Sequence, residues 1–209
     1  PRPLSSTLAK NLLRMLPVEA HYRMDHSETK AAYTAGAALH ELLLEGRLSS
    51  VVECEFDSWR SAEARQMRDQ IIASGKRPML TAELVEIRQI VKAVKSNPLV
   101  RELLPDYGRA EVSALAVLHG VKVQARFDYL VMADAPTGSR FGTWGWIVDV
   151  KTVAGSANPH DFNRTAANYG YHIQADLYQR VARALGHELP FYWLVVSKTP
   201  PFACSIIRV

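Results

Sequence analysis

Apolar and polar residues are spaced in two ways along the chain, and the spacing divides it into a helical first part and a strand-rich second part. In the first part, apolar residues recur every three or four positions, as on one face of a helix. This spacing predicts helices over residues 4–16, 32–45, 58–74 and 81–96. Ser5 or Ser6 is expected to cap the first helix and Thr81 the last, which Asn97-Pro98 should end.

Strict alternation of apolar and polar residues begins after position 109 and predicts strands. The expected strands are residues 110–118, 121–131, 143–152, 190–197 and 202–209. Asn158-Pro159 should open a helical segment that continues to about Leu185 and ends at Gly186. Helices, three strands, a helix and two strands predict an α/β fold, with a central mixed β-sheet flanked by helices.

The length and composition suit one globular domain over residues 1–209. We expect a helical part over about 1–100 and a catalytic sheet core over about 108–209. The chain is 48% hydrophobic and 22% charged, which argues against disorder. A net charge of +4 permits a polyanionic partner without requiring one.

Location is predicted from what the sequence does not contain. No stretch approaches the roughly 18 apolar residues that a membrane span needs. Residues 1–16 lack a signal-peptide pattern, and Cys54 and Cys204 do not form a metal-ligand motif. We therefore expect a cytoplasmic protein with reduced cysteines and no membrane partner.

Two of the predicted strands carry charged residues that could perform chemistry. Side chains alternate along a strand, so Arg126 and Asp128 share the polar face of the segment 121–131. In the segment 146–152, Asp149 and Lys151 share one face, about 6.5 Å apart along the strand. If the two strands pair, Asp128 can reach the same cleft.

An acidic pair beside a lysine is the minimal set for hydrolysing a phosphodiester with a metal ion. Two carboxylates can hold Mg²⁺, which prefers oxygen ligands, and Mn²⁺ could substitute for it. The metal would act as a Lewis acid and activate the attacking water. A lysine could orient or deprotonate that water and stabilise the developing negative charge.

Each of these motifs could also be purely structural. An Asp-x-Lys triplet recurs by chance, and on its own a surface ion pair between strands accounts for it better. The helix that follows presents Tyr171, Gln174 and Tyr178 together, either beside the carboxylates or as ordinary boundary residues. Its other face should form the core stripe: Ile173, Leu177, Val181 and Ala184.

In combination, the motifs resemble a known family. The chain is similar to the RecB-like branch of the PD-(D/E)XK nucleases, and within it to RecE-like (exonuclease VIII-like) nuclease domains of phages and prophages. The similarity follows the expected order over most of the chain. It is carried by residues 36–45, 110–113, 126–128, 147–152, 169–178 and 198–203.

The resemblance implies a role for each matching residue. Asp128 and Asp149 would be metal ligands, and Lys151 the catalytic lysine. His40, Glu111 and the Val150 carbonyl would complete the metal site. Gln174 and Tyr178 would form the helix motif of the branch.

Four of the candidate residues outside the Asp-x-Lys triplet have to be weighed one by one. A lone histidine on an apolar helix such as His40 is usually structural, and Leu44 excludes a zincin motif. Glu111 could be an edge-strand charge. Arg126 could bind DNA or form a structural ion pair. Tyr171 could stack on a base.

The resemblance also implies an activity. We expect a Mg²⁺-dependent exonuclease that digests linear double-stranded DNA from 5′ ends, leaving 3′ single strands for recombination. Partners would be DNA ends, further copies of the chain in a ring, and a RecT-like annealing protein in a bacterial or phage-infected cell. Two alternatives stay open: a RecB-like endonuclease for single strands or flaps, and a catalytically silent DNA-binding module.

Overall fold

The computed structural model of the chain describes residues 3–26, 31–134 and 137–209. The chain forms two compact units. The sheet unit comprises Pro1–Glu28 and Pro98–Val209, and the small unit comprises Thr29–Asn97. Compactness does not show that either unit folds alone, so the expected single domain and its boundaries stay predictions.

The sheet unit is built on five strands in the order β3-β4-β5-β6-β7. Their bounds are β3 (Arg109–Leu118), β4 (Val121–Met132), β5 (Gly145–Val153), β6 (Phe191–Ser197) and β7 (Cys204–Arg208). Neighbours are antiparallel except β5 and β6, which are parallel. The predicted mixed sheet flanked by helices is thereby confirmed.

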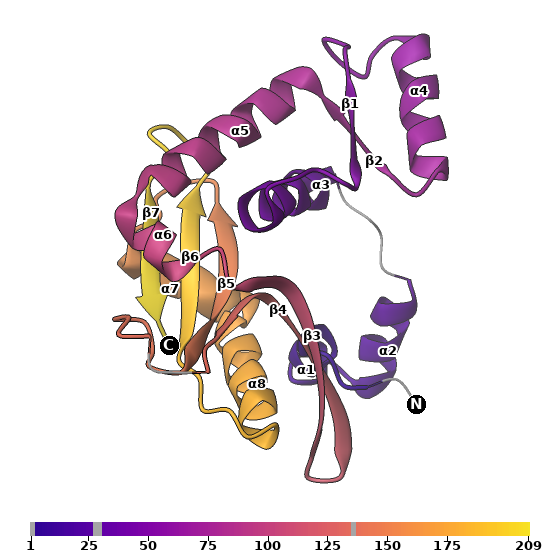
Figure 1. The fold of residues 1–209 in the computed structure, drawn as a ribbon. Helices are drawn as coiled ribbons and strands as arrows, with labels where there is room; N and C mark the ends of the chain where they lie inside the picture. The colour runs from indigo at the N-terminus through magenta and orange to yellow at the C-terminus, as the bar shows by residue number, and fades with distance from the viewer. Residues whose placement is uncertain (1–2, 27–30, 135–136) are drawn as a thin grey trace. The chain divides into compact units, whose positions relative to one another are not determined.

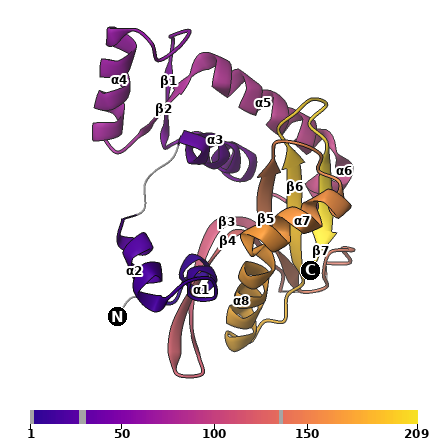
Figure 2. The same cartoon turned by 180° about the vertical axis from the view of Figure 1, so that it is seen from behind.

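The parallel pair requires a crossover, which two helices supply (Figure 2). They are α7 (Pro159–Tyr169) and α8 (Tyr171–Ala184), and their buried residues share one apolar cluster with the sheet. The single helical segment expected here was wrong. Gly170 adopts a left-handed φ of 65°, which ends α7 and redirects the chain into α8.

The central strands are buried on both faces, as parallel strands in layered folds usually are. Every residue of β6 is buried, and so are the first six residues of β5. On the face opposite α8, the Trp146 indole N–H donates to the Leu103 carbonyl at 2.8 Å, which holds α6 (Pro98–Leu103).

The hairpin of β3 and β4 bends away from β5 and extends out from the rest of the sheet (Figure 1). β4 pairs with β5 only over residues 129–132. The inner face of the projecting part buries Val123, Ala125 and Phe127 in the apolar cluster shared with α8. Its tip is the predicted turn at His119 and Gly120, both with positive φ.

Two N-terminal helices belong to this unit: α1 (Ser6–Leu12) and α2 (Pro17–Asp25). They replace the single helix expected over residues 4–16. Ser5 caps α1 by accepting a hydrogen bond from the Leu8 amide at 3.2 Å, as predicted. Leu4 forms a bridge with Val123 and so holds the start of α1 against β4.

The small unit contains four helical segments and a two-stranded parallel sheet. They are α3 (Ala31–His40), the π-helical turn η1 (Glu41–Glu45), β1 (Val51–Cys54), α4 (Ala62–Ala73), β2 (Arg77–Leu80) and α5 (Thr81–Ser96). The two strands were not predicted, because four residues are too few to establish an alternating pattern. Thr81 is the first helical residue of α5, so the cap position is Leu80.

The buried carboxylate of Glu41 organises the turn before β1. It accepts hydrogen bonds from the backbone amides of Ser49 and Ser50 at 2.8 and 2.9 Å, and from both hydroxyls. In the part of the chain that the structure describes, no helix has the length and apolarity to cross a membrane.

Candidate active site

Three acidic residues lie in one row across neighbouring strands. In the pairing of β3 with β4, Ala110 lies opposite Tyr129 and Val112 lies opposite Phe127. Glu111 of β3 therefore lies opposite Asp128 of β4. The register between β4 and β5 continues the row to Asp149. Residues opposite each other in antiparallel strands point to the same face, so three carboxylates converge. Oxygen atoms of Glu111 and Asp128 lie within 4.8 Å of each other.

Glu111 has an unusual backbone conformation that sets the direction of its side chain. Its φ is 56°, in the left-handed region that residues other than glycine rarely adopt. Strained backbone of this kind clusters at functional sites. The Glu111 carboxylate forms an ion pair with Arg126, whose side chain remains 67% exposed. Arg126, a predicted DNA contact, is thus placed next to the acidic row.

Asp128 holds its carboxylate against the backbone of β5. Its Oδ2 accepts a hydrogen bond from the Val150 amide at 2.8 Å. Burial raises the pKa of Asp128 well above its usual value, and the neighbouring Asp149 raises it further, against the opposing effect of Lys151. The repulsion between these two carboxylates is the electrostatic condition under which a cation binds strongly.

Asp149 is fully buried, with an ion pair at one carboxylate oxygen and a hydrogen bond at the other. The Lys151 ammonium lies 2.5 Å from Oδ2, and the Gln174 amide donates to Oδ1 at 2.7 Å. Burial opposes the charge on Lys151, but the attraction of Asp149 and Asp128 outweighs burial and raises the Lys151 pKa. Lys151 is therefore protonated at neutral pH and acts here as a cationic hydrogen-bond donor.

Gln174 and Tyr178 lie on the buried face of α8, against the sheet. The sequence predicted that the buried face of this helix would be the stripe of Ile173, Leu177, Val181 and Ala184. That prediction was wrong, because only Val181 of the four is buried. Leu177 is only half-buried and Ala184 is exposed. A polar residue occupies the sheet-facing side because the buried Asp149 needs a hydrogen-bond donor.

The two motif residues of α8 have different contacts. Gln174 contacts both charged groups, since its Oε1 also accepts from the Lys151 ammonium at 3.4 Å. Tyr178 packs edge-to-face on Phe127, with ring centres 5.4 Å apart, and its hydroxyl hydrogen-bonds with Ser6. Gln174 is placed to orient the charged groups, and Tyr178 to fix α8 against β4 and α1.

Replacing Gln174 with methionine is expected to reduce DNA cleavage by about 10- to 100-fold, the usual effect of removing a group that orients a metal-binding carboxylate. Steady-state cleavage of a labelled duplex measures it. Gln179→Met is the matched control, because Gln179 lies on the same helix and makes one long hydrogen bond, of 3.5 Å, to the Leu189 carbonyl. Equal activity in the two variants would show that Gln174 does not orient the charged groups for cleavage.

Tyr171, the other predicted DNA contact, lies beside Lys151, the predicted catalytic lysine. The Lys151 ammonium is 4.6 Å from the centre of the Tyr171 ring, within cation–π distance. Tyr171 also stacks with Phe162 and Tyr169, at centroid distances of 6.0 and 5.7 Å. Since Tyr169 is exposed, the stacked rings continue from the site to the surface.

One residue near the site was not singled out in the sequence. The ammonium group of Lys10, on α1, lies 5.8 Å from the centre of the Tyr171 ring at the start of α8. Nothing local marks Lys10, because its position depends on contacts between α1 and residues more than a hundred positions away.

The residues present fit a hard divalent cation. Three carboxylates supply oxygen donors of the kind that Mg²⁺ and Mn²⁺ prefer. The Oδ2 of Asp149 is ion-paired with Lys151 but receives no hydrogen bond of ordinary geometry from the described residues, which leaves it able to bind a metal. His40 ends α3 in the small unit, so its membership of this site stays a prediction, as does that of the Val150 carbonyl.

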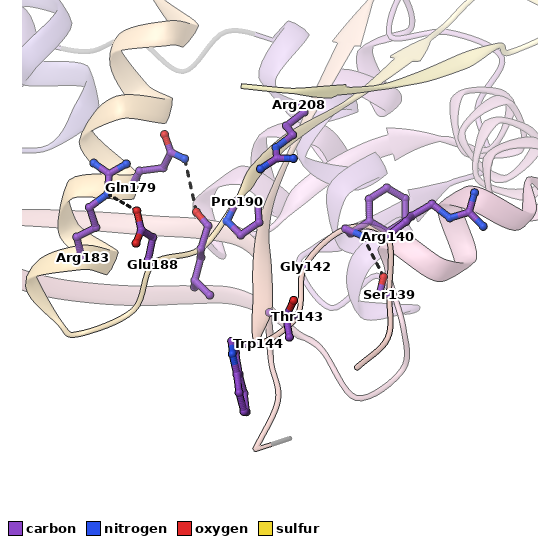
Figure 3. Close-up of a pocket in the computed structure, with 13 residues that line it drawn as sticks. Ser139, Arg140, Gly142, Thr143, Trp144, Gln179, Arg183, Glu188, Pro190 and Arg208 are labelled. Atoms are coloured by element: carbon purple, nitrogen blue, oxygen red, sulfur yellow. Dashed lines mark hydrogen bonds and ion pairs between the residues drawn. The ribbon is translucent and has the colours of Figure 1, made fainter. Parts of the chain in front are cut away.

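A hollow of about 560 Å³ lies elsewhere, at the opposite ends of β5 and β6 from Lys151 (Figure 3). Its lining includes Arg140, Trp144, Arg183 and Arg208, and none of the predicted site residues. Its one carboxylate, Glu188, faces Arg183 at 3.9 Å. A single paired carboxylate does not make a metal site for nuclease chemistry.

Comparison with known proteins places the chain in a family. Residues 12–209 match the family described as "PDDEXK-like domain of unknown function (DUF3799)". The chain therefore belongs to this family, and its expected place among the PD-(D/E)XK-like proteins is confirmed. Together with the acidic row, the family supports nuclease activity. No curated protein matches the sequence.

Two solved structures are similar to the chain. The crystal structure of a protein named "Putative exonuclease", from Eubacterium rectale, matches 99% of this chain and 72% of its own, with a TM-score of 0.65 and 18% identity. This similarity shows a shared fold. The crystal structure of SSO0001 matches 87% of this chain and 77% of its own, at 12% identity, but its TM-score of 0.33 is too low to inform the function.

Proposed function

We propose that the chain is a metal-dependent exodeoxyribonuclease that degrades linear double-stranded DNA from 5′ ends and leaves 3′ single strands. The observation that carries the chemistry is the row of Glu111, Asp128 and Asp149 with Lys151 beside it. The preference for ends and the polarity are supported by the resemblance to RecE-like nucleases. The name of the Eubacterium rectale protein agrees with action at ends.

In this proposal the acidic row holds a divalent cation. When bound, that cation supplies Lewis acidity and lowers the pKa of a water. Lys151 donates a hydrogen bond to a non-bridging oxygen of the scissile phosphate, where negative charge increases in the transition state. Gln174 hydrogen-bonds with both Lys151 and Asp149 and holds the two side chains in fixed positions, so that the cation and the lysine act on the same phosphate.

We extend the ligand set, by resemblance, to His40 and the Val150 carbonyl. His40→Ala should then weaken Mn²⁺ binding measured by isothermal titration calorimetry, because one ligand is lost. Asp149→Asn provides the positive control, since it removes a ligand that the sheet unit itself places in the row. Unchanged Mn²⁺ affinity in His40→Ala would remove His40 from the site.

The test of the activity compares linear duplex DNA with closed circles in Mg²⁺, with the label at either the 5′ or the 3′ end. The proposal expects early release of a 5′ label, late release of a 3′ label and intact circles. Lys151→Ala serves as the inactive control. Cleavage of circles would favour the endonuclease alternative. DNA binding without hydrolysis in any metal would favour the silent binding module.

A ring assembly is the remaining part of the proposal, and it follows from the same resemblance. Light scattering coupled to size-exclusion chromatography measures the mass in solution directly. A mass of several chains would support a ring, whereas the mass of one chain, at concentrations where DNA is digested processively, would rule it out.

A further inference from the structure

The first helix is fixed to the catalytic part of the sheet unit by contacts at its beginning. The Leu4 amide donates to the Lys122 carbonyl at 2.8 Å, and the Gln124 amide donates to the Leu4 carbonyl at 2.9 Å. Two residues further on, Ser6 hydrogen-bonds with the hydroxyl of Tyr178. The position of α1 relative to β4 and α8 is therefore set by bonds at two neighbouring points.

This anchoring brings a second lysine to the ring that contacts Lys151. The ammonium groups of Lys10 and Lys151 lie 5.8 and 4.6 Å from the centre of the Tyr171 ring. Both distances are within the range in which a ring face attracts a cation. The two lysines belong to α1 and β5, so they are brought close together by the tertiary structure and not by their positions in the sequence.

Gly170 allows the close approach of α1 to the start of α8. A Cβ at this position would lie 3.2 Å from the Lys10 Cδ and 3.2 Å from a guanidinium nitrogen of Arg14. Arg14 also donates to the Ala167 carbonyl at 3.3 Å. Lys10 of α1 and Arg14, which follows the end of α1, are four residues apart and therefore both lie beside the same glycine at the start of α8.

The charge on Lys10 has no matching partner in this arrangement. Among the residues that the structure describes, no carboxylate forms an ion pair with Lys10. Burial lowers the pKa of Lys10, and the nearby charges of Lys151 and Arg14 lower it further, with only Asp149 opposing them. Lys10 and Lys151 share one ring and Arg14 lies beside Gly170, so the three cations repel one another, and a bound anion would relieve the repulsion.

We propose that Lys10 binds a phosphate group of the DNA strand beside the one contacted by Lys151, with Arg14 supporting the same anion from four residues further along. The inference rests on the proposed function for the identity of the anion, because a nuclease must hold phosphates on both sides of the bond it cuts. That phosphate is either a terminal 5′-phosphate or an internal phosphodiester. The chemistry of recognition is the same in both.

The test measures duplex DNA binding in EDTA, so that its result does not depend on cleavage. Fluorescence anisotropy would compare the wild type, Lys10→Ala, Lys10→Arg and Lys92→Ala, the last removing the same charge from the exposed face of α5. We expect Lys10→Ala to bind about tenfold more weakly and to lower the slope of log affinity against log salt by about 1. Lys10→Arg should restore most of the DNA affinity and most of the salt slope. Lys92→Ala should match the wild type in both quantities.

Two duplexes separate the sources of the phosphate. A loss of affinity seen only with a 5′-phosphorylated end identifies the terminal phosphate, and an equal loss with a 5′-hydroxyl end identifies an internal one. Wild-type affinity and salt slope in Lys10→Ala would overturn the proposal, and so would a loss that Lys10→Arg fails to restore, because that result points to a structural role.

The same variants distinguish this inference from the proposed function. If the wild type cleaves no DNA in Mg²⁺, the proposed function fails, while binding in EDTA still reports on Lys10. If the wild type cleaves and Lys10→Ala binds DNA normally, only the role of Lys10 fails. Mn²⁺ affinity should not fall in Lys10→Ala, because an ammonium group is not a metal ligand and its loss removes a charge that repels the cation.

Discussion

Replacing Lys151 with methionine is expected to lower DNA cleavage by about 10³-fold, the usual effect of losing a preorganised donor to a developing oxyanion. Methionine fills a similar length but carries no charge. The lost group is the only lysine that contacts both Asp149 and Gln174 among the described residues. Initial rates on a labelled linear duplex in saturating Mg²⁺ measure the effect.

The same substitution should also change stability in a way that depends on metal. Without Lys151, the buried carboxylates of Asp149 and Asp128 lose their cation, which costs about 3 kcal/mol when no metal is bound. Urea unfolding with EDTA and with Mg²⁺ separates this loss from the loss of cleavage. Lys198→Met, at an exposed lysine on the loop between β6 and β7, is the matched control. Cleavage by Lys151→Met at the level of this control would contradict the catalytic role.

The largest effect on folding is expected from Trp146→Ala. Trp146 is fully buried in β5, and its indole N–H donates to the Leu103 carbonyl. Removing a buried tryptophan leaves a cavity and an unpaired carbonyl, which together should lower the free energy of unfolding by about 3–5 kcal/mol. Equilibrium urea unfolding monitored by circular dichroism gives the value.

Trp144 provides the matched control, since it is the same residue type two positions earlier and is 54% exposed. Trp144→Ala should change the free energy of unfolding by less than about 0.5 kcal/mol. A cost in Trp146→Ala as small as that in Trp144→Ala would mean that the contact between β5 and α6 contributes little to stability.

The positions of the candidate catalytic residues could be predicted because local rules govern them. Alternation along each strand placed Asp149 and Lys151 on one face, and the tight turn at Gly120 brought Glu111 opposite Asp128. Resemblance, rather than geometry, was needed to include Glu111, because nothing in the sequence announces a left-handed backbone at a glutamate.

The elements that were missed depend on partners distant in sequence. Gly170 lies inside an otherwise continuous helical pattern, and its left-handed conformation and its closeness to Lys10 and Arg14 appear only in the folded chain. For α8, the sequence left the face of Tyr171, Gln174 and Tyr178 either beside the carboxylates or at the boundary, and put the core stripe on the other face, because amphipathic patterns assume that burial follows hydrophobicity. A buried Asp149 reversed that rule for Gln174.

The crossover between β5 and β6 has a consequence for when activity appears during folding. Asp149 and Lys151 come before the two helices, Gln174 lies within them, and the parallel strand that closes the sheet comes last. Contacts between residues far apart in sequence form slowly, since the entropy of closing the intervening loop is lost first. A partly folded chain in which α8 has not yet packed on β5 therefore lacks the bonds from Gln174 to Asp149 and Lys151, and we expect the proposed activity to appear only after this crossover has formed.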